Sequence, residues 1–193
     1  MNWFLSLAIF SSLSLNLIVQ LGLGIENSGP LRQDEGRLPL VQIGSFFLAV
    51  PLLWAFFTYL LTPFFFGFSE YFLLFPLSAL AGIGFDRLFA FFSPKAAARG
   101  EAFTPMTGYD GLILAALALT LHLASAFIEA LVLSLGFSLG ILLSLCILRG
   151  IQKRSVIERT PLFLRGVPLM LLSMGLLALI FSSAADLFFK ALE

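Results

Sequence analysis

The sequence predicts an all-α membrane protein with six transmembrane helices in a single integral domain, residues 1–193. Of its 193 residues, 60% are hydrophobic and only 11% are charged, whereas a soluble domain is nearer half apolar and a quarter charged. The apolar residues gather in stretches long enough to cross a hydrocarbon layer of about 30 Å. The Lys and Arg residues fall between these stretches, which is typical of polytopic membrane proteins.

Three spans are expected in the first half of the chain. Residues 3–24 lack the basic start and the cleavage site of a signal peptide, so we expect a permanent span there. Residues 40–62 form the second span, in which Pro51 predicts a kink. Residues 68–85 form the third span, which also contains a proline, Pro76.

The second half begins with an apolar run, residues 109–148, that is too long for one span. As a single helix it would be about 60 Å long, twice the thickness of the hydrocarbon layer. We therefore expect two spans, residues 109–124 and 127–148, folded back near Ser125. Residues 166–189 form the sixth span, after a basic segment that starts at Arg149.

The positive charges predict the topology. Ten of the eleven Lys and Arg residues lie at or in the three long polar segments, residues 25–38, 93–108 and 149–165, and only Lys190 lies elsewhere. With six spans, these three segments share one side of the membrane. Because Lys and Arg mark the cytoplasmic side, the long loops are expected in the cytoplasm and both termini outside, in a bacterial-type inner membrane.

Polar residues stand at the inner end of the first span. Asn16 and Gln20 are four residues apart and share a helix face, and Gly22 and Gly24 follow them. Such a span end is costly in hydrocarbon unless it is buried in protein or lines a cavity. Two interpretations stay open: hydrogen bonds between helices, or the lining of a broken-helix cavity on an ion path.

Three ionisable residues are further candidates for an ion path. Glu70 and Glu129 each lie beside a short connection that is predicted on the outer side of the membrane. They are either solvated carboxylates or parts of an outer vestibule that attracts cations. His122 lies near the outer end of the fourth span. It is either a neutral histidine bonded to a carbonyl or a proton-relay residue.

Other patterns point to packing rather than chemistry. Gly136 and Gly140 form a small-xxx-small pattern, which predicts close helix packing. The one cysteine, Cys146, and the one histidine leave no internal disulfide and no Cys-based metal site. No nucleotide or hydrolase motif is present, and nucleic acid is not an expected partner. We expect no cofactor to be held by this chain alone.

Three segments together resemble a known family. They are residues 16–24 (NLIVQLGLG), residues 135–139 (LGFSL) and residues 160–166 (TPLFLRG), and they are similar to the six-span membrane subunits of the Rnf and Nqr electron-transport complexes. The resemblance implies two inverted three-helix repeats with broken or short first and fourth helices. It also implies other membrane subunits as partners, including a homologous subunit of inverted topology. Termini on the outer side of the membrane fit the A-type subunit of this pair.

The chain departs from this family at the cluster ligands. In the family, cysteines of the first and fourth spans hold a [2Fe–2S] cluster between two subunits, and such clusters need thiolate ligands. Here Gly24 occupies the first position, and residues 112–121 hold no cysteine. The resemblance therefore implies a redox-silent subunit with an ion-path or scaffold role, at most a non-catalytic part of a redox-driven ion translocase.

Two alternatives stay open. One is a small transporter or channel component, such as the six-span substrate-binding subunit of a vitamin transporter, for which cytoplasmic termini would be expected. The other is a true electron-transfer subunit whose cluster is ligated wholly by a partner.

Overall fold

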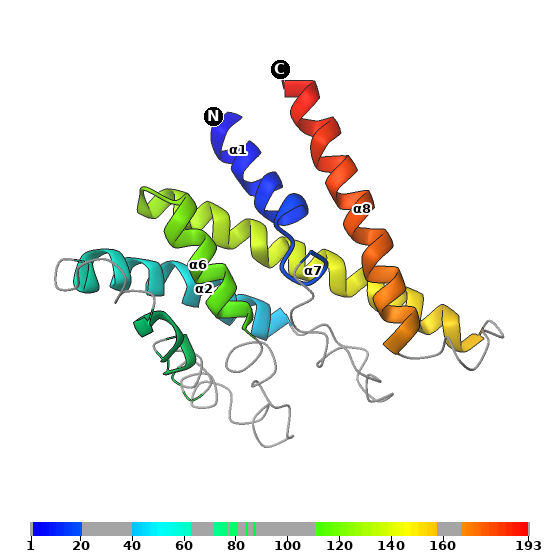
Figure 1. Ribbon diagram of the computed structural model, residues 1–193, viewed down its shortest axis with the longest axis horizontal. Coiled ribbons are helices and arrows are strands. Elements are labelled where there is room, and N and C mark those ends of the chain that lie inside the picture. The colour runs from blue at the N-terminus through cyan, green and yellow to red at the C-terminus, as the bar shows by residue number, and fades with distance from the viewer. Residues whose placement is uncertain are drawn as a thin grey trace. The chain divides into compact units, whose positions relative to one another are not determined.

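The computed structural model describes residues 2–20, 40–62, 72–76, 78–80, 84, 87, 111–157 and 167–192. Within these ranges the chain forms helices and turns and no strand, which confirms the all-α class for the described residues. The labelled elements, in chain order, are α1 (Asn2–Ile9), η1 (Phe10–Ser14), α2 (Leu40–Phe56), η3 (Phe57–Leu61), α6 (Leu112–Leu123), α7 (Phe127–Ile157) and α8 (Val167–Leu192) (Figure 1).

Among the residues that the structure describes, two helices are long and apolar enough to cross a membrane. The apolar stretches are Phe127–Ile151 in α7, with 25 residues, and Pro168–Phe188 in α8, with 21 residues. At 1.5 Å per residue they are about 37 Å and about 31 Å long, which matches or exceeds the hydrocarbon thickness of about 30 Å. Three shorter apolar helices accompany them: Trp3–Ser14, Phe46–Leu61 and Leu112–Leu123.

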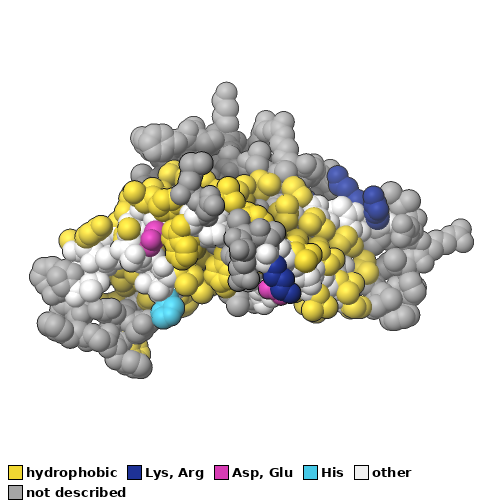
Figure 2. Space-filling model, turned by 90° about the horizontal axis from the view of Figure 1, so that it is seen from above, with side chains coloured by type: hydrophobic (Ala, Val, Ile, Leu, Met, Phe, Trp, Pro, Cys, Tyr) yellow, Lys and Arg dark blue, Asp and Glu magenta, His cyan; other side chains and the backbone are white. Residues whose placement is uncertain are grey.

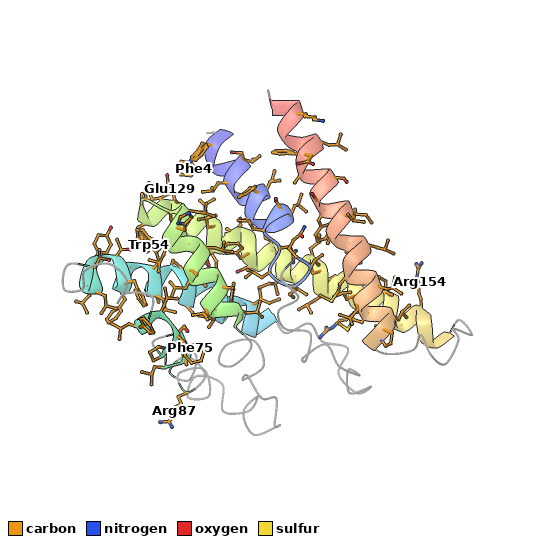
Figure 3. The ribbon with its side chains drawn as sticks, viewed as in Figure 1. Phe4, Trp54, Phe75, Arg87, Glu129 and Arg154 are labelled. Carbon is orange, nitrogen blue, oxygen red and sulfur yellow. The ribbon has the colours of Figure 1, made fainter. Side chains whose placement is uncertain are left out.

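The helix α7 continues beyond the point where the sequence predicts a basic loop. The loop was expected from Arg149, but α7 ends at Ile157. The reason is local: this stretch contains no proline, and its Arg, Lys and Gln residues favour a helix. Arg154 therefore lies on the last turn of α7, near the opposite end from Glu129 (Figure 3).

The long apolar run of the second half is divided between two helices, in agreement with the length argument. The helix α6 ends at Leu123, and α7 begins at Phe127. No glycine or proline makes this turn. Instead, the backbone N–H and the hydroxyl of Ser125 donate hydrogen bonds of 2.9 Å and 2.8 Å to the Glu129 carboxylate, which holds the start of α7.

Contacts divide the chain into two compact units. Unit 1 comprises Met1–Leu38 and Gly136–Glu193, and unit 2 comprises Pro39–Leu135. Unit 1 thus combines the first helix of the chain with α8 and most of α7. Unit 2 combines α6 with α2 and the described residues near 75 and 79. Each unit joins a short helix from one half of the chain to longer elements from the other half.

The core of unit 2 lies between α2 and α6. Trp54 and Phe46 of α2 are buried, as are Leu112 and Leu117 of α6. Trp54 also lies edge-on to Tyr59, with ring centroids 6.1 Å apart. The apolar contact of these two helices therefore stabilises this unit.

Hydrophobic side chains cover much of the described surface (Figure 2). On α8 the exposed side chains include Leu172, Leu176 and Leu179, with exposed fractions of 56%, 59% and 68%. Buried residues such as Met174 and Phe181 lie on the opposite face of the same helix. Monomeric soluble proteins rarely expose large contiguous apolar patches, so this outer face of α8 has the composition of a lipid-facing surface.

Candidate functional site

The first helix is interrupted at Asn16, within the segment that the sequence singles out. Its last turn, η1, is a π-helical turn, in which the Leu15 N–H donates to the Phe10 carbonyl oxygen at 3.0 Å. Asn16 is not helical, and residues 17–20 form a turn closed by a hydrogen bond of 2.8 Å from the Gln20 N–H to the Asn16 carbonyl. π-Helical turns are frequent at functional sites.

The structure places an interruption earlier in this segment than the glycines that the sequence interpretation relied on. The sequence predicts one span to residue 24, with an end broken by Gly22 and Gly24. The structure ends the regular helix at Ser14, well before either glycine. The physical cause is the Asn16 side chain, which forms the hydrogen bonds that the helix would otherwise supply. Gly22 and Gly24 themselves lie outside the described residues.

The Asn16 side chain is fully buried and has all of its hydrogen-bonding groups paired. Its Oδ1 accepts hydrogen bonds from the N–H groups of Ile18 and Val19, both at 3.2 Å. Its Nδ2 donates to the carbonyl of Ser12 at 3.1 Å and to that of Gly140 on α7 at 2.9 Å. A side-chain amide offers two donors and one carbonyl oxygen. Asn16 therefore binds both sides of the break and a second helix.

The two glycines of α7 allow the first helix to approach closely. A Cβ atom on Gly136 would overlap the Ser11 side chain and lie 2.6 Å from the Ala8 carbonyl oxygen. A Cβ atom on Gly140 would lie 2.6 Å from the Ser12 carbonyl oxygen. Both distances are shorter than real Cβ contacts. The small-xxx-small pattern thus faces residues 8–16 of the first helix.

The break lies level with the middle of both long apolar stretches. Gly140, which binds Asn16, is one residue past the midpoint of Phe127–Ile151. Ala178, whose carbonyl accepts a hydrogen bond of 3.3 Å from the Gln20 side chain, is the midpoint of Pro168–Phe188. Where these stretches cross a bilayer, the polar break is therefore at the centre of the hydrocarbon layer.

The remaining candidates lie elsewhere. Glu129 is half-buried and holds the first turn of α7 through Ser125, which gives it a structural role. His122 is exposed in the last turn of α6. Both belong to unit 2, whereas Asn16 and Gln20 belong to unit 1. Glu70 lies outside the described residues, so its pairing with Glu129 stays a prediction.

Sequence reasoning missed Ser11 and Ser12, which contribute the other half of the close contact. The usable signal was the adjacent pair of small residues one turn before Asn16, on a segment that must meet a glycine-bearing helix. Within the described ranges, no three His, Cys, Asp or Glu residues gather at one point. Cys146 is exposed on α7. The site is therefore a neutral polar break, built from amides, hydroxyls and backbone.

No protein-family model matches the chain, and no curated protein matches it significantly.

Proposed function

We propose that this chain is a membrane subunit of an ion-translocating electron-transport assembly similar to the Rnf and Nqr complexes, and that it contributes to the ion path or the scaffold. The observation that carries this proposal is the interruption of the first helix at Asn16, level with the middle of α7 and α8. Non-helical backbone at membrane depth is tolerated only where it is buried in protein or lines an aqueous cavity. Transporters place their ion sites at such interrupted helices.

The composition of the two units supports the implied repeats. In an inverted repeat, helices one, two and three correspond to helices four, five and six. Unit 1 holds the first helix with most of α7 and with α8, and unit 2 holds α6 with α2 and the described residues of the predicted third span. When the first and second halves of the chain are interchanged, each helix of unit 1 has its counterpart in unit 2. This correspondence supports a chain built from two inverted repeats.

We further propose six spans, with the three long loops in the cytoplasm and both termini outside. Single cysteines at Ser28, Ala97 and Ser155, in a Cys146→Ser background, are expected to be shielded from an impermeant thiol reagent in intact cells, because the basic segments stay inside. A cysteine at Asn2 is expected to react. Labelling of Ala97 and Ser155 from opposite sides would contradict the six-span count.

The proposed subunit does not hold an iron–sulfur cluster by itself. Gly24 and residues 112–121 supply no thiolate at the positions that the resemblance implies. Protein purified alone under anaerobic conditions is expected to contain no stoichiometric iron and no visible cluster absorption. Iron that is present in the wild type and lost in Cys146→Ser would revive an electron-transfer role.

The experiment that tests the assembly role is purification of the tagged chain from native membranes in a mild detergent. The proposal predicts that other integral membrane subunits carrying redox cofactors are purified with it, and that the assembly drives Na⁺ or H⁺ uptake into vesicles. Recovery with a nucleotide-hydrolysing subunit would instead favour the vitamin-transporter alternative. Recovery of the chain alone would contradict both.

A further inference from the structure

The helix α7 continues beyond its apolar stretch and carries basic residues there. The apolar stretch ends at Ile151, and the helix ends at Ile157. The extra residues add about 9 Å of helix, which is comparable to the headgroup layer on one side of a bilayer. Lys153 and Arg154 are exposed on this extension, and Arg154 projects from it in Figure 3. Where α7 crosses a bilayer, these side chains are therefore held at the level of the lipid headgroups.

Three basic residues, Arg149, Lys153 and Arg154, share one side of α7 and are called the basic arc. At about 100° per residue they lie within roughly 140° of one another around the helix axis. Ile141 and Leu148 are buried, and they lie on the side of the helix opposite to the middle of this arc. The basic arc therefore points away from the packed face of α7.

Gly150 lies within the basic arc and leaves its centre open. It is exposed, and a Cβ atom built on it would meet nothing within 4 Å. Lys153 and Arg154 are three and four residues further on, which makes them its neighbours on the helix surface. Long helical side chains lean toward the preceding turn, so these two cover the turn of Gly150. An open surface flanked by basic side chains is suited to the oxygen atoms of a phosphate group.

The positive charge of the chain is concentrated next to this end of α7. Residues 149–165 contain five basic residues and one acidic residue, a net charge of +4. Residues 25–38 have a net charge of −1, and residues 93–108 have a net charge of +1. Clusters of Lys and Arg immediately beside a span attract anionic lipid headgroups. Of the three polar segments, the one that begins in the basic arc therefore attracts such headgroups most strongly.

The same side of α7 is apolar and exposed on the membrane side of the basic arc. Leu139 and Leu143 have exposed fractions of 52% and 42%, and Cys146 is exposed as well. At about 100° per residue, all three fall within the range of angles that the basic arc covers. This side of α7 thus presents about 10 Å of apolar surface followed by three cations. A phospholipid has its hydrocarbon and its phosphate in the same order.

We propose that this side of α7 binds an anionic phospholipid, with the phosphate over Gly150 and the acyl chains along Leu139 and Leu143. An anionic headgroup is favoured over a zwitterionic one because a choline group would bring a further cation to the basic arc. A lipid is favoured over a soluble phosphate compound because only a lipid also covers the exposed leucines. The inference requires α7 to span the membrane and does not depend on the electron-transport role.

The test is lipid binding by the purified full-length chain in detergent, measured by native mass spectrometry during titration with phosphatidylglycerol or phosphatidylcholine. The wild type is expected to bind one phosphatidylglycerol at least about tenfold more tightly than phosphatidylcholine. In the double variant Lys153→Gln/Arg154→Gln this preference is expected to fall by at least about tenfold. Lys190→Gln is the matched control. Lys190 is exposed at the end of α8, but it follows the exposed Asp186 by one turn, which offsets its charge, so this variant is expected to bind as the wild type.

Gly150→Leu separates a defined site from diffuse attraction of charge. Because a side chain at this position meets no neighbour, the melting temperature without lipid is expected to stay at or above that of the wild type. The leucine occupies the position of the phosphate, and the affinity for phosphatidylglycerol is expected to fall at least about fivefold. Equal affinity of the wild type for the two lipids would overturn the proposal, and so would wild-type affinity in Gly150→Leu. Displacement of the lipid by an equal concentration of inorganic phosphate would overturn the assignment to a lipid.

Discussion

Replacing Gly136 with leucine is expected to prevent the first helix from packing against α7. Even a single Cβ atom at this position would overlap the Ser11 side chain and press on the backbone carbonyl of Ala8. Overpacking a tight contact costs about 1–3 kcal/mol and sometimes more, and the larger side chain cannot avoid the backbone. We expect a loss of about 3 kcal/mol for Gly136→Leu, measured by thermal or denaturant unfolding in detergent.

The matched control is Gly175→Leu. Gly175 also lies within a long apolar helix, but nothing lies within 4 Å of the position that its Cβ would take. This variant is expected to remain within about 1 kcal/mol of the wild type, because its side chain meets no neighbour and leucine has a better helix propensity than glycine. Ser11→Gly combined with Gly136→Ala should recover only part of the stability, because the Ala8 carbonyl remains in place. Equal stability of Gly136→Leu and Gly175→Leu would contradict the close contact.

Replacing Asn16 with alanine is expected to destabilise the break itself. Four hydrogen bonds are lost, and the N–H groups of Ile18 and Val19 and the carbonyls of Ser12 and Gly140 lose a buried partner. An unsatisfied buried group costs about 1–3 kcal/mol, although local rearrangement recovers part of this. We expect a net loss of about 3 kcal/mol in the same unfolding measurement.

Two further variants test whether the buried side chain of Asn16 is what stabilises the break. Gln20→Ala removes another amide, but this one is exposed and makes a single bond of 3.3 Å, so its effect should be below about 0.5 kcal/mol. Asn16→Asp keeps the acceptor for Ile18 and Val19 but loses the donor to Gly140 and buries a charge. It should be at least as harmful as alanine at neutral pH. An Asn16→Ala protein as stable as Gln20→Ala would mean that Asn16 does not hold the break.

The sequence predicts the parts of this fold that depend on composition and length. The apolar stretches of α7 and α8, and the division of residues 109–148 near Ser125, follow from hydropathy and from the thickness of a bilayer. The glycine pattern at Gly136 and Gly140 likewise predicts a close contact, because small residues one turn apart allow the backbones of two helices to approach each other closely.

The sequence does not predict what depends on distant partners. The first helix is interrupted at Asn16, and one of the four hydrogen bonds of the Asn16 side chain goes to Gly140, 124 residues away. No local pattern contains such a pairing. The extension of α7 to Ile157 was missed because its charged residues indicate solvent exposure but equally permit a helix.

The proposed function depends on the break in the first helix lying at the middle of the membrane. It is tested most directly by the depth of a spin label at position 20, in a Cys146→Ser background reconstituted into lipid bilayers. Relative accessibility to oxygen and to a water-soluble nickel chelate reports the depth. Labels on Gln20→Cys and on the reference Leu179→Cys, next to the midpoint of the apolar stretch of α8, are expected within about 5 Å of the same depth near the bilayer centre. A label at position 20 in the headgroup region, with the label at position 179 at the centre, would contradict it.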